Sequence, residues 1–282
     1  MMRLKDKVAI VSGGGQGIGE GIVKCLAEEG ADVAIVDLNG DNAEKVTASV
    51  KSLGRKALAI QADATDREKV EQAVQKAIDS FGEIDILVNN VGGADRRTLE
   101  KAFAFGDELG AHILDMMSLA NEEEWDRSYA VNLKSHFLMS RAVAPHMVKR
   151  KSGRIINISS QAGKDPDPMN MPYGTFKGAV VTFTHALARL LAGENITVNC
   201  ILPGLIYTPL WETYATLLTH ANPQLKGMSP RDMFLKTQVS QVPLGREQTV
   251  EDIGRAVVYF SSEDGKNITG QSLMVNGGQV MD

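Results

Sequence analysis

The chain has 282 residues, of which 43% are hydrophobic and 23% are charged. This composition excludes an intrinsically disordered chain, and the length excludes a small disulfide-stabilised domain. Thirty basic and thirty-five acidic side chains give a formal net charge of −5. That acidity argues against a nucleic-acid-binding protein that works through a general positive field, so we expect no nucleic-acid partner.

The cysteines, histidines and apolar runs exclude further classes of protein. Cys25 and Cys200 lie far apart, so the sequence indicates neither a disulfide framework nor a cysteine metal site. The five histidines show no metal-ligand spacing, and we expect no metal. No apolar run approaches the roughly 18 residues of a membrane helix, and the N-terminus lacks a signal peptide's apolar core. We therefore expect a cytoplasmic protein without a membrane partner.

Short apolar runs rich in β-branched residues alternate with longer helical stretches along the chain. Continuous apolar runs are typical of parallel strands that are buried on both faces. The predicted strands are Val8–Val11, Val33–Val36, Ala57–Ile60, Ile84–Val88, Ile155–Ile158, Ile196–Ile201 and Leu273–Val275. Repeated strand–helix–strand units predict one α/β domain over residues 1–282, with a doubly wound, mostly parallel seven-stranded sheet and helices on both faces.

Two segments interrupt this alternation. Residues 93–121 form an unusually long connection after the fourth strand, which we interpret as an insertion. Residues 203–248 separate the sixth strand from the helix that begins near Thr249, and we interpret them as a substrate lid. Both segments follow the carboxyl ends of strands, where ligands bind in open α/β sheets.

A glycine-rich loop joins the first strand to the first helix. Gly13, Gly17 and Gly19 allow a tight turn there, and the helix N-terminus presents free N–H groups to a phosphate. Asp37 ends the second strand, where a carboxylate can accept hydrogen bonds from a ribose 2′-hydroxyl. The same carboxylate would repel a 2′-phosphate, so the sequence favours NAD over NADP. A turn or N-cap role is the alternative interpretation of Asp37.

The next two strands end in polar or glycine-containing turns. Asp63 follows the third strand and can hydrogen bond to an adenine amino group, although alone it is also typical of a turn. Asn90 and Gly92 follow the fourth strand and bring backbone close to a ribose. Their place at one sheet edge favours a dinucleotide cleft.

Tyr173 and Lys177 are four residues apart, which places a phenol and an ammonium on one helical face. A phenol has a pKa near 10, and a nearby ammonium favours its ionised form and lowers that pKa. Tyr173 is therefore a candidate general acid and base. Ser160 ends the fifth strand thirteen residues earlier and can hydrogen bond to the same substrate oxygen.

Taken together, these motifs resemble the single-domain subgroup of the short-chain dehydrogenase/reductase family over nearly the whole chain. The resemblance rests on Gly13-x3-Gly17-x-Gly19, Asp63, Asn89-Asn90-Val91-Gly92, Asn132, Ser160, Tyr173-x3-Lys177 and Pro203-Gly204. It implies a Rossmann-like fold, proton exchange by Tyr173, substrate orientation by Ser160, binding of the nicotinamide ribose by Lys177 and a water relay supported by Asn132. It also implies a homotetramer, with a homodimer as the alternative.

The resemblance also extends the set of expected cofactor-binding residues. Ile206 and Thr208 are expected beside the nicotinamide carboxamide and a phosphate. The complete expected set is Gly13, Gln16, Gly17, Ile18, Gly19, Asp37, Asp63, Ala64, Asn90, Gly92, Tyr173, Lys177, Pro203, Gly204, Ile206 and Thr208.

The leading functional hypothesis is an NAD-dependent enzyme that interconverts a secondary alcohol and a ketone. The lid carries Trp211 and Tyr214, which together with Ser160 and Tyr173 are the candidate substrate residues and favour a partly apolar or cyclic small molecule. Trp211 and Tyr214 can equally stack on a sugar ring or complete the core. The alternatives are an NADPH-dependent 3-oxoacyl-thioester reductase and a nucleotide-sensing regulator without catalytic activity.

Overall fold

Seven parallel strands form one sheet in the computed structural model, which describes residues 2–94, 121–221, 225 and 227–281. The strand order is β3-β2-β1-β4-β5-β6-β7, so the order reverses between β1 and β4. The strands are β1 Val8–Ser12, β2 Asp32–Asp37, β3 Ala57–Gln61, β4 Ile86–Asn89, β5 Gly153–Ile158, β6 Ile196–Pro203 and β7 Ser272–Val275. All seven predicted strands, and the doubly wound fold class, are confirmed.

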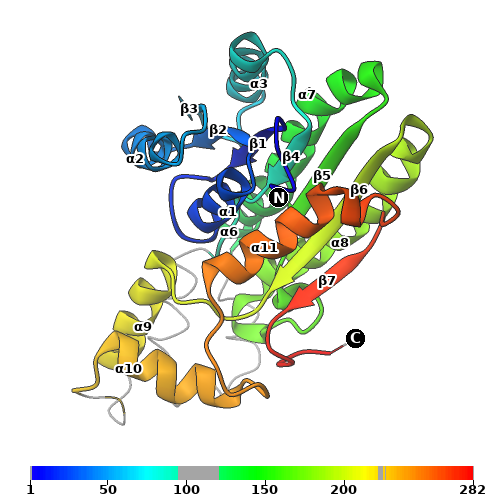
Figure 1. The fold of residues 1–282 in the computed structure, drawn as a ribbon. Coiled ribbons are helices and arrows are strands. Elements are labelled where there is room, and N and C mark those ends of the chain that lie inside the picture. The colour runs from blue at the N-terminus through cyan, green and yellow to red at the C-terminus, as the bar shows by residue number, and fades with distance from the viewer. Residues whose placement is uncertain (1, 95–120, 222–224, 226, 282) are drawn as a thin grey trace.

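Helices cover both faces of the sheet (Figure 1). The described helices of the sheet layers are α1 Gly17–Glu28, α2 Gly40–Ser52, α3 Arg67–Phe81, α6 Glu122–Tyr129, α7 Ser135–Arg150, α8 Met171–Leu191 and α11 Val250–Ser261. One buried cluster joins α1, α2 and α11 to the sheet, and a second joins α3, α7 and α8 to the opposite face. Two-sided burial explains why the strands are continuously apolar.

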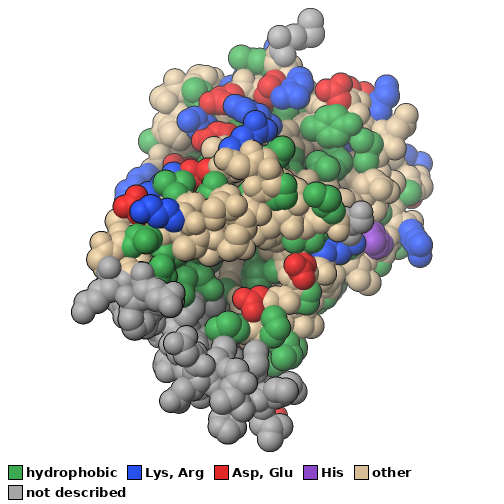
Figure 2. Space-filling view, turned by 90° about the horizontal axis from the view of Figure 1, so that it is seen from below, with side chains coloured by type: hydrophobic (Ala, Val, Ile, Leu, Met, Phe, Trp, Pro, Cys, Tyr) green, Lys and Arg blue, Asp and Glu red, His purple; other side chains and the backbone are tan. Residues whose placement is uncertain are grey.

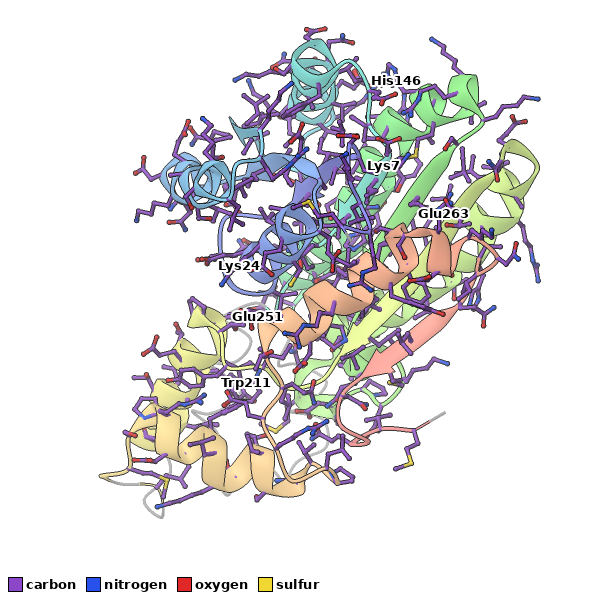
Figure 3. The ribbon with its side chains drawn as sticks, viewed as in Figure 1. Lys7, Lys24, His146, Trp211, Glu251 and Glu263 are labelled. Carbon is purple, nitrogen blue, oxygen red and sulfur yellow. The ribbon has the colours of Figure 1, made fainter. Side chains whose placement is uncertain are left out.

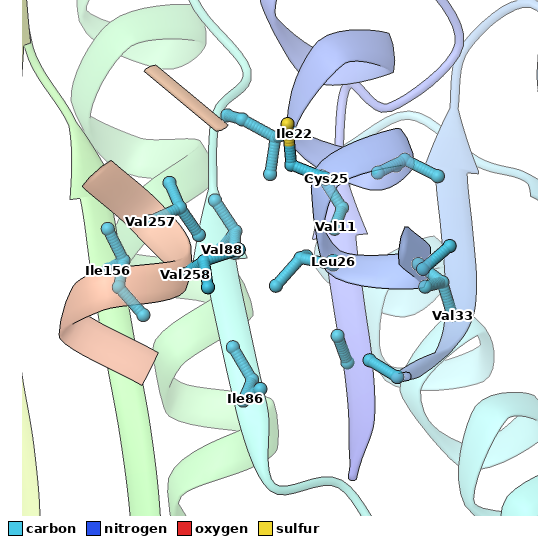
Figure 4. Close-up of a cluster of buried hydrophobic side chains, with 14 of the residues drawn as sticks. Val11, Ile22, Cys25, Leu26, Val33, Ile86, Val88, Ile156, Val257 and Val258 are labelled. Carbon is cyan, nitrogen blue, oxygen red and sulfur yellow. The ribbon is translucent and has the colours of Figure 1, made fainter. Parts of the chain in front are cut away.

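The first of these clusters shows how the sequence pattern becomes packing (Figure 4). Ile22 and Leu26 of α1 are one helical turn apart and fully buried, and Val257 of α11 is fully buried beside them in the same cluster. Beneath these helices lie apolar side chains of the central strands, including Val11 and Val88. Burying each such side chain stabilises the fold by roughly 1.5–3 kcal/mol, so the packing of α1 and α11 on the sheet contributes substantially to the stability of the core.

The segment over 203–248 folds as helices that lie apart from the sheet layers (Figure 1). It contains α9 Pro209–Ala221 and α10 Pro230–Met233, followed by a π-helical turn at Phe234–Gln238. Phe234 is fully buried and packs against Tyr207 and Trp211, with ring centroids 5.3 Å away in both pairs. These aromatic contacts form a small core within the segment, and its role as a substrate lid stays a prediction. Most of the expected insertion, residues 95–120, lies outside the described residues.

Two further properties follow from the described part of the chain. None of its helices is both long and apolar enough to cross a membrane. Within the same residues, no group of three or more histidine, cysteine, aspartate or glutamate side chains is arranged to hold a metal ion.

Candidate active site

A cavity of about 450 Å³ lies at the carboxyl edge of the sheet, where the strand order reverses. The loop after β1 borders it, with Gly13 at φ +65° and Gly17 at φ +56°. Such dihedrals favour glycine, because a β-carbon there strains the backbone. The side chain of Gln16, the N-cap residue of α1, makes no capping hydrogen bond, so it leaves the N–H groups of the first helical turn available to a ligand. This is the arrangement that binds a phosphate.

Asp37 lines the same cavity. Its Oδ2 accepts a hydrogen bond from the Gly15 N–H at 2.8 Å, and its Oδ1 accepts one from the Asn39 N–H at 2.9 Å. Asn39, rather than Asp37, caps α2. Each carboxylate oxygen retains a second lone pair, so Asp37 can still accept hydrogen bonds from a ribose hydroxyl.

The turn after β4 holds backbone close to the catalytic candidates. Asn90 donates from Nδ2 to the Gly13 carbonyl at 2.8 Å, which ties this turn to the glycine-rich loop. A β-carbon at Gly92 would collide with Lys177 Nζ and lie 2.9 Å from Asn132 Oδ1. Only glycine therefore leaves space for these two side chains. The residues present fit a bound dinucleotide.

Lys177 and Tyr173 project from α8 into this cavity, as their spacing predicts. Lys177 is 3% exposed, and its Nζ donates to the Ile158 carbonyl at 3.0 Å and lies 5.8 Å from the centroid of the Tyr173 ring. Ser160 follows β5, and its Oγ accepts a hydrogen bond from the Ala162 N–H. The structure thus brings Ser160, Tyr173 and Lys177 together at one end of the cavity.

The titration properties of these groups are set mainly by burial. Burial raises the pKa of Tyr173, and its hydrogen bond with Ser160 acts in the opposite direction. Burial lowers the pKa of Lys177 to about 8. The predicted lowering of the Tyr173 pKa by Lys177 is therefore wrong for the chain by itself, because loss of solvation of the phenolate dominates.

Asn132 lies in a π-helical turn, Ala130–Lys134, between α6 and α7. Its fully buried side chain accepts a hydrogen bond from the Gly93 N–H at 2.9 Å and donates to the Gly93 and Ser128 carbonyls, both at 3.1 Å. Such single π turns are frequent at functional sites. Here Asn132 holds the backbone of Gly93, which follows the turn after β4. Its role in a water relay stays a prediction.

A second cavity, of about 300 Å³, adjoins the first at Ser160 and Tyr173. Trp211 and Tyr214 of α9 line it, with their rings edge to face and centroids 4.7 Å apart. Trp211 lies at the boundary between the lid helices and the sheet layers (Figure 3). Seen from below, hydrophobic and acidic side chains gather around a hollow on this face of the molecule (Figure 2). The arrangement suits a small molecule between the lid and Tyr173.

The expected cofactor-binding residues line the first cavity with two exceptions, Asp63 and Ala64. Asp63 Oδ1 instead accepts hydrogen bonds from the Thr65 N–H and Oγ1, in a turn that leads into α3. Its contact with adenine stays a prediction.

Several lining residues were not identified from sequence. Of these, Leu38 directly follows Asp37, and that adjacency is the signal that points to it. Gln161 and Gln279 line the second cavity without belonging to any motif.

Comparison with known proteins identifies the family. A family model described as short chain dehydrogenase matches residues 7–217. The chain belongs to the short-chain dehydrogenase family. This short-chain dehydrogenase is 36% identical to (2S)-[(R)-hydroxy(phenyl)methyl]succinyl-CoA dehydrogenase subunit BbsD of Thauera aromatica, with 99% of both chains covered. It is 30% identical to 3-oxoacyl-[acyl-carrier-protein] reductase FabG of Thermotoga maritima, with 99% of this chain and 100% of that protein covered.

A solved structure of NAD+-bound xylitol dehydrogenase is also similar to this short-chain dehydrogenase. It matches with a TM-score of 0.84 and 30% identity, over 98% of this chain and 100% of the other. The protein is therefore an oxidoreductase of a family that binds a nicotinamide cofactor.

Proposed function

We propose that the protein transfers a hydride between NAD(H) and a secondary alcohol or ketone, with Tyr173 as general acid and base. The observation that carries this proposal is the wall shared by the two cavities, which contains both Ser160 and Tyr173. A substrate oxygen at this wall lies beside the hydroxyl groups that would bind it. The reacting carbon then faces the larger cavity, where the cofactor-binding loops lie.

The side chains at this wall have different roles in the proposed alcohol oxidation. Tyr173 takes the hydroxyl proton, and Ser160 orients the same oxygen through its own hydroxyl. Lys177, whose Nζ lies 5.8 Å from the centroid of the Tyr173 ring, would hold the nicotinamide ribose beside the phenol. When bound, the cofactor supplies the hydride acceptor, and the chain's contribution is to align the two reactants.

The preference for NAD rests on Asp37. Asp37 and Lys177 are the charged residues among the described lining of the larger cavity, and Lys177 is at the Tyr173 end. A 2′-phosphate bound beside Asp37 meets a like charge, and the only lysine in the described lining, Lys177, lies beside Tyr173 rather than beside Asp37. A ribose with a free 2′-hydroxyl instead donates a hydrogen bond to the carboxylate.

The second candidate function is the NADPH-dependent reduction of a 3-oxoacyl thioester. It is favoured by similarity to a relative named as a 3-oxoacyl-[acyl-carrier-protein] reductase. A reductase assay with one ketone and one 3-oxoacyl thioester, each with NADH and with NADPH, separates the two functions. Faster reduction of the thioester with NADPH would support the second candidate and overturn the NAD proposal.

The variant Tyr173→Phe tests whether the protein is a catalyst at all. We expect it to lower kcat by about 10²–10⁴-fold, the usual contribution of a general acid or base. The Kd for NAD, measured by fluorescence titration, should change by less than about threefold, because a single neutral hydrogen bond contributes little to binding. A variant with unchanged turnover would contradict the mechanism, and a protein that binds NAD but turns over no alcohol or ketone would support the regulator alternative.

A further inference from the structure

The smaller, substrate-side cavity has two chemically unlike walls. One wall is aromatic and aliphatic, formed mainly by Leu210, Trp211 and Tyr214 of α9. The polar part of the lining, here called the polar wall, consists of Gln161, Asp165, Asp167, Asn170 and Gln279. From this juxtaposition, and resting on the proposed alcohol oxidation, we propose that the protein oxidises a cyclic polyol that carries no anionic group.

Gln161 is the central residue of the polar wall. It directly follows Ser160, and its Nε2 donates to Gln279 Oε1 at 3.0 Å. Its own Oε1 is buried and has no hydrogen-bond partner among the described residues. A buried acceptor without a donor is unfavourable, and a rotation of the Gln161 side chain toward the cavity that it lines would let a substrate hydroxyl supply that donor. The polar wall therefore binds a molecule with more than one hydroxyl group.

The charge of the polar wall determines which polyols fit. Asp165 and Asp167 are both exposed at the cavity, and Asp167 accepts a hydrogen bond from the Met169 N–H at 2.9 Å. Burial, together with the negative charge of Asp167, raises the pKa of Tyr214 to about 12. No lysine or arginine is among the described residues that line it. Carboxylates accept hydrogen bonds from hydroxyl groups and repel a carboxylate or phosphate on the substrate.

The aromatic wall and the size of the cavity favour a ring. A ring polyol presents its C–H face to an aromatic side chain and its hydroxyl groups to the opposite side. The volume of about 300 Å³ is at the lower limit of typical ligand cavities. A six-membered ring fits this space, with one carbinol carbon at Ser160 and Tyr173 and the neighbouring hydroxyl groups at Gln161 and Asp167.

Three kinds of probe test the proposal in an NAD-reduction assay: the inositol stereoisomers, cyclohexanol, and quinate, which is a cyclohexane polyol with a carboxylate. We expect at least one inositol to have a kcat/KM about tenfold or more above those of cyclohexanol and quinate. If cyclohexanol or quinate is oxidised as efficiently as every inositol, the polyol inference is wrong while alcohol oxidation stands. If no alcohol or ketone reacts, the proposed function is wrong. Calorimetry of inositol with the protein–NADH complex then tests the polyol inference by itself, and an absence of inositol binding overturns that inference.

Two variants test the polar wall directly. Gln161→Leu should raise KM for the inositol by about 3–10-fold more than it raises KM for cyclohexanol, the effect of one neutral hydrogen bond. Asp167→Asn keeps the acceptor for the Met169 N–H and should raise kcat/KM for quinate by about 3–10-fold, because it removes one like charge. Asp264→Asn, at an exposed position in the 3-10 turn Glu263–Gly265 that follows α11, is the matched control and should change neither value. An unchanged inositol KM in Gln161→Leu would overturn the role of Gln161.

Discussion

The stability of the protein between pH 7 and pH 5 should depend on His136, a histidine of α7 that is 1% exposed. Burial and then the positive charge of Lys177 lower the pKa of His136 from 6.5 to about 3, while the carbonyls of Ile158 and Asn89 partly offset this. In the unfolded chain the same imidazole binds a proton near pH 6.5. The unfolded state therefore binds more protons over this range, and stability falls as the pH falls.

The size of the effect follows from the two pKa values. At pH 5 the unfolded imidazole is protonated and the folded one is neutral, so the free energy of unfolding is about 2 kcal/mol lower than at pH 7. Lys177, with a pKa of about 8, is protonated in both states over this interval and adds almost no slope. A loss of about 2 kcal/mol corresponds to a fall in Tm of about 4–8 °C for a chain of this size.

The assay is urea denaturation of the cofactor-free protein at fixed concentration, at pH 5, 6 and 7. The variant His136→Leu cannot take up the proton, so its free energy of unfolding should be nearly constant over this range. His185→Gln, at an exposed position on α8, is the matched control and should keep the wild-type dependence. A wild-type protein with constant stability, or a His136→Leu variant with the wild-type slope, would refute the reasoning.

Two further predictions concern the cofactor preference and the packing of α1 on α11. Asp37→Ser should lower the ratio of kcat/KM with NAD to kcat/KM with NADP by about 10–100-fold, because it removes both a charged acceptor for the ribose and the repulsion of a 2′-phosphate. Steady-state kinetics with both cofactors measure this ratio. An unchanged ratio would contradict the role of Asp37. Gly254→Ala should lower the free energy of unfolding by about 1–3 kcal/mol in urea denaturation, because its β-carbon would lie 2.6 Å from Cys25 Sγ. Gly193→Ala, whose β-carbon has open space around it, is the control; equal stabilities would show that the α1–α11 contact adjusts freely.

The strands themselves and the cofactor edge could be predicted from local features of the chain. A strand buried on both faces requires a continuous apolar run, such as Val8–Ser12, and only a short segment is needed to recognise it. The glycine-rich loop is similarly local, since Gly13 and Gly17 adopt positive φ in a turn of a few residues. Tyr173 and Lys177 share a helical face because of helical periodicity alone. For these features, residue type and spacing are sufficient, because burial of a strand, positive φ at a glycine and helical periodicity each depend on a few neighbouring residues.

Properties that depend on what lies around a group were decided by the tertiary structure. The pKa of Tyr173 moves upward because the packing around α8 takes solvation from the phenolate, which the spacing to Lys177 does not reveal. Gln161 and Gln279 form one hydrogen bond from segments 118 residues apart, so no local pattern marks them as neighbours. Desolvation and contacts between distant segments are properties of the packed chain, whereas periodicity and backbone conformation are already present in a short stretch of sequence.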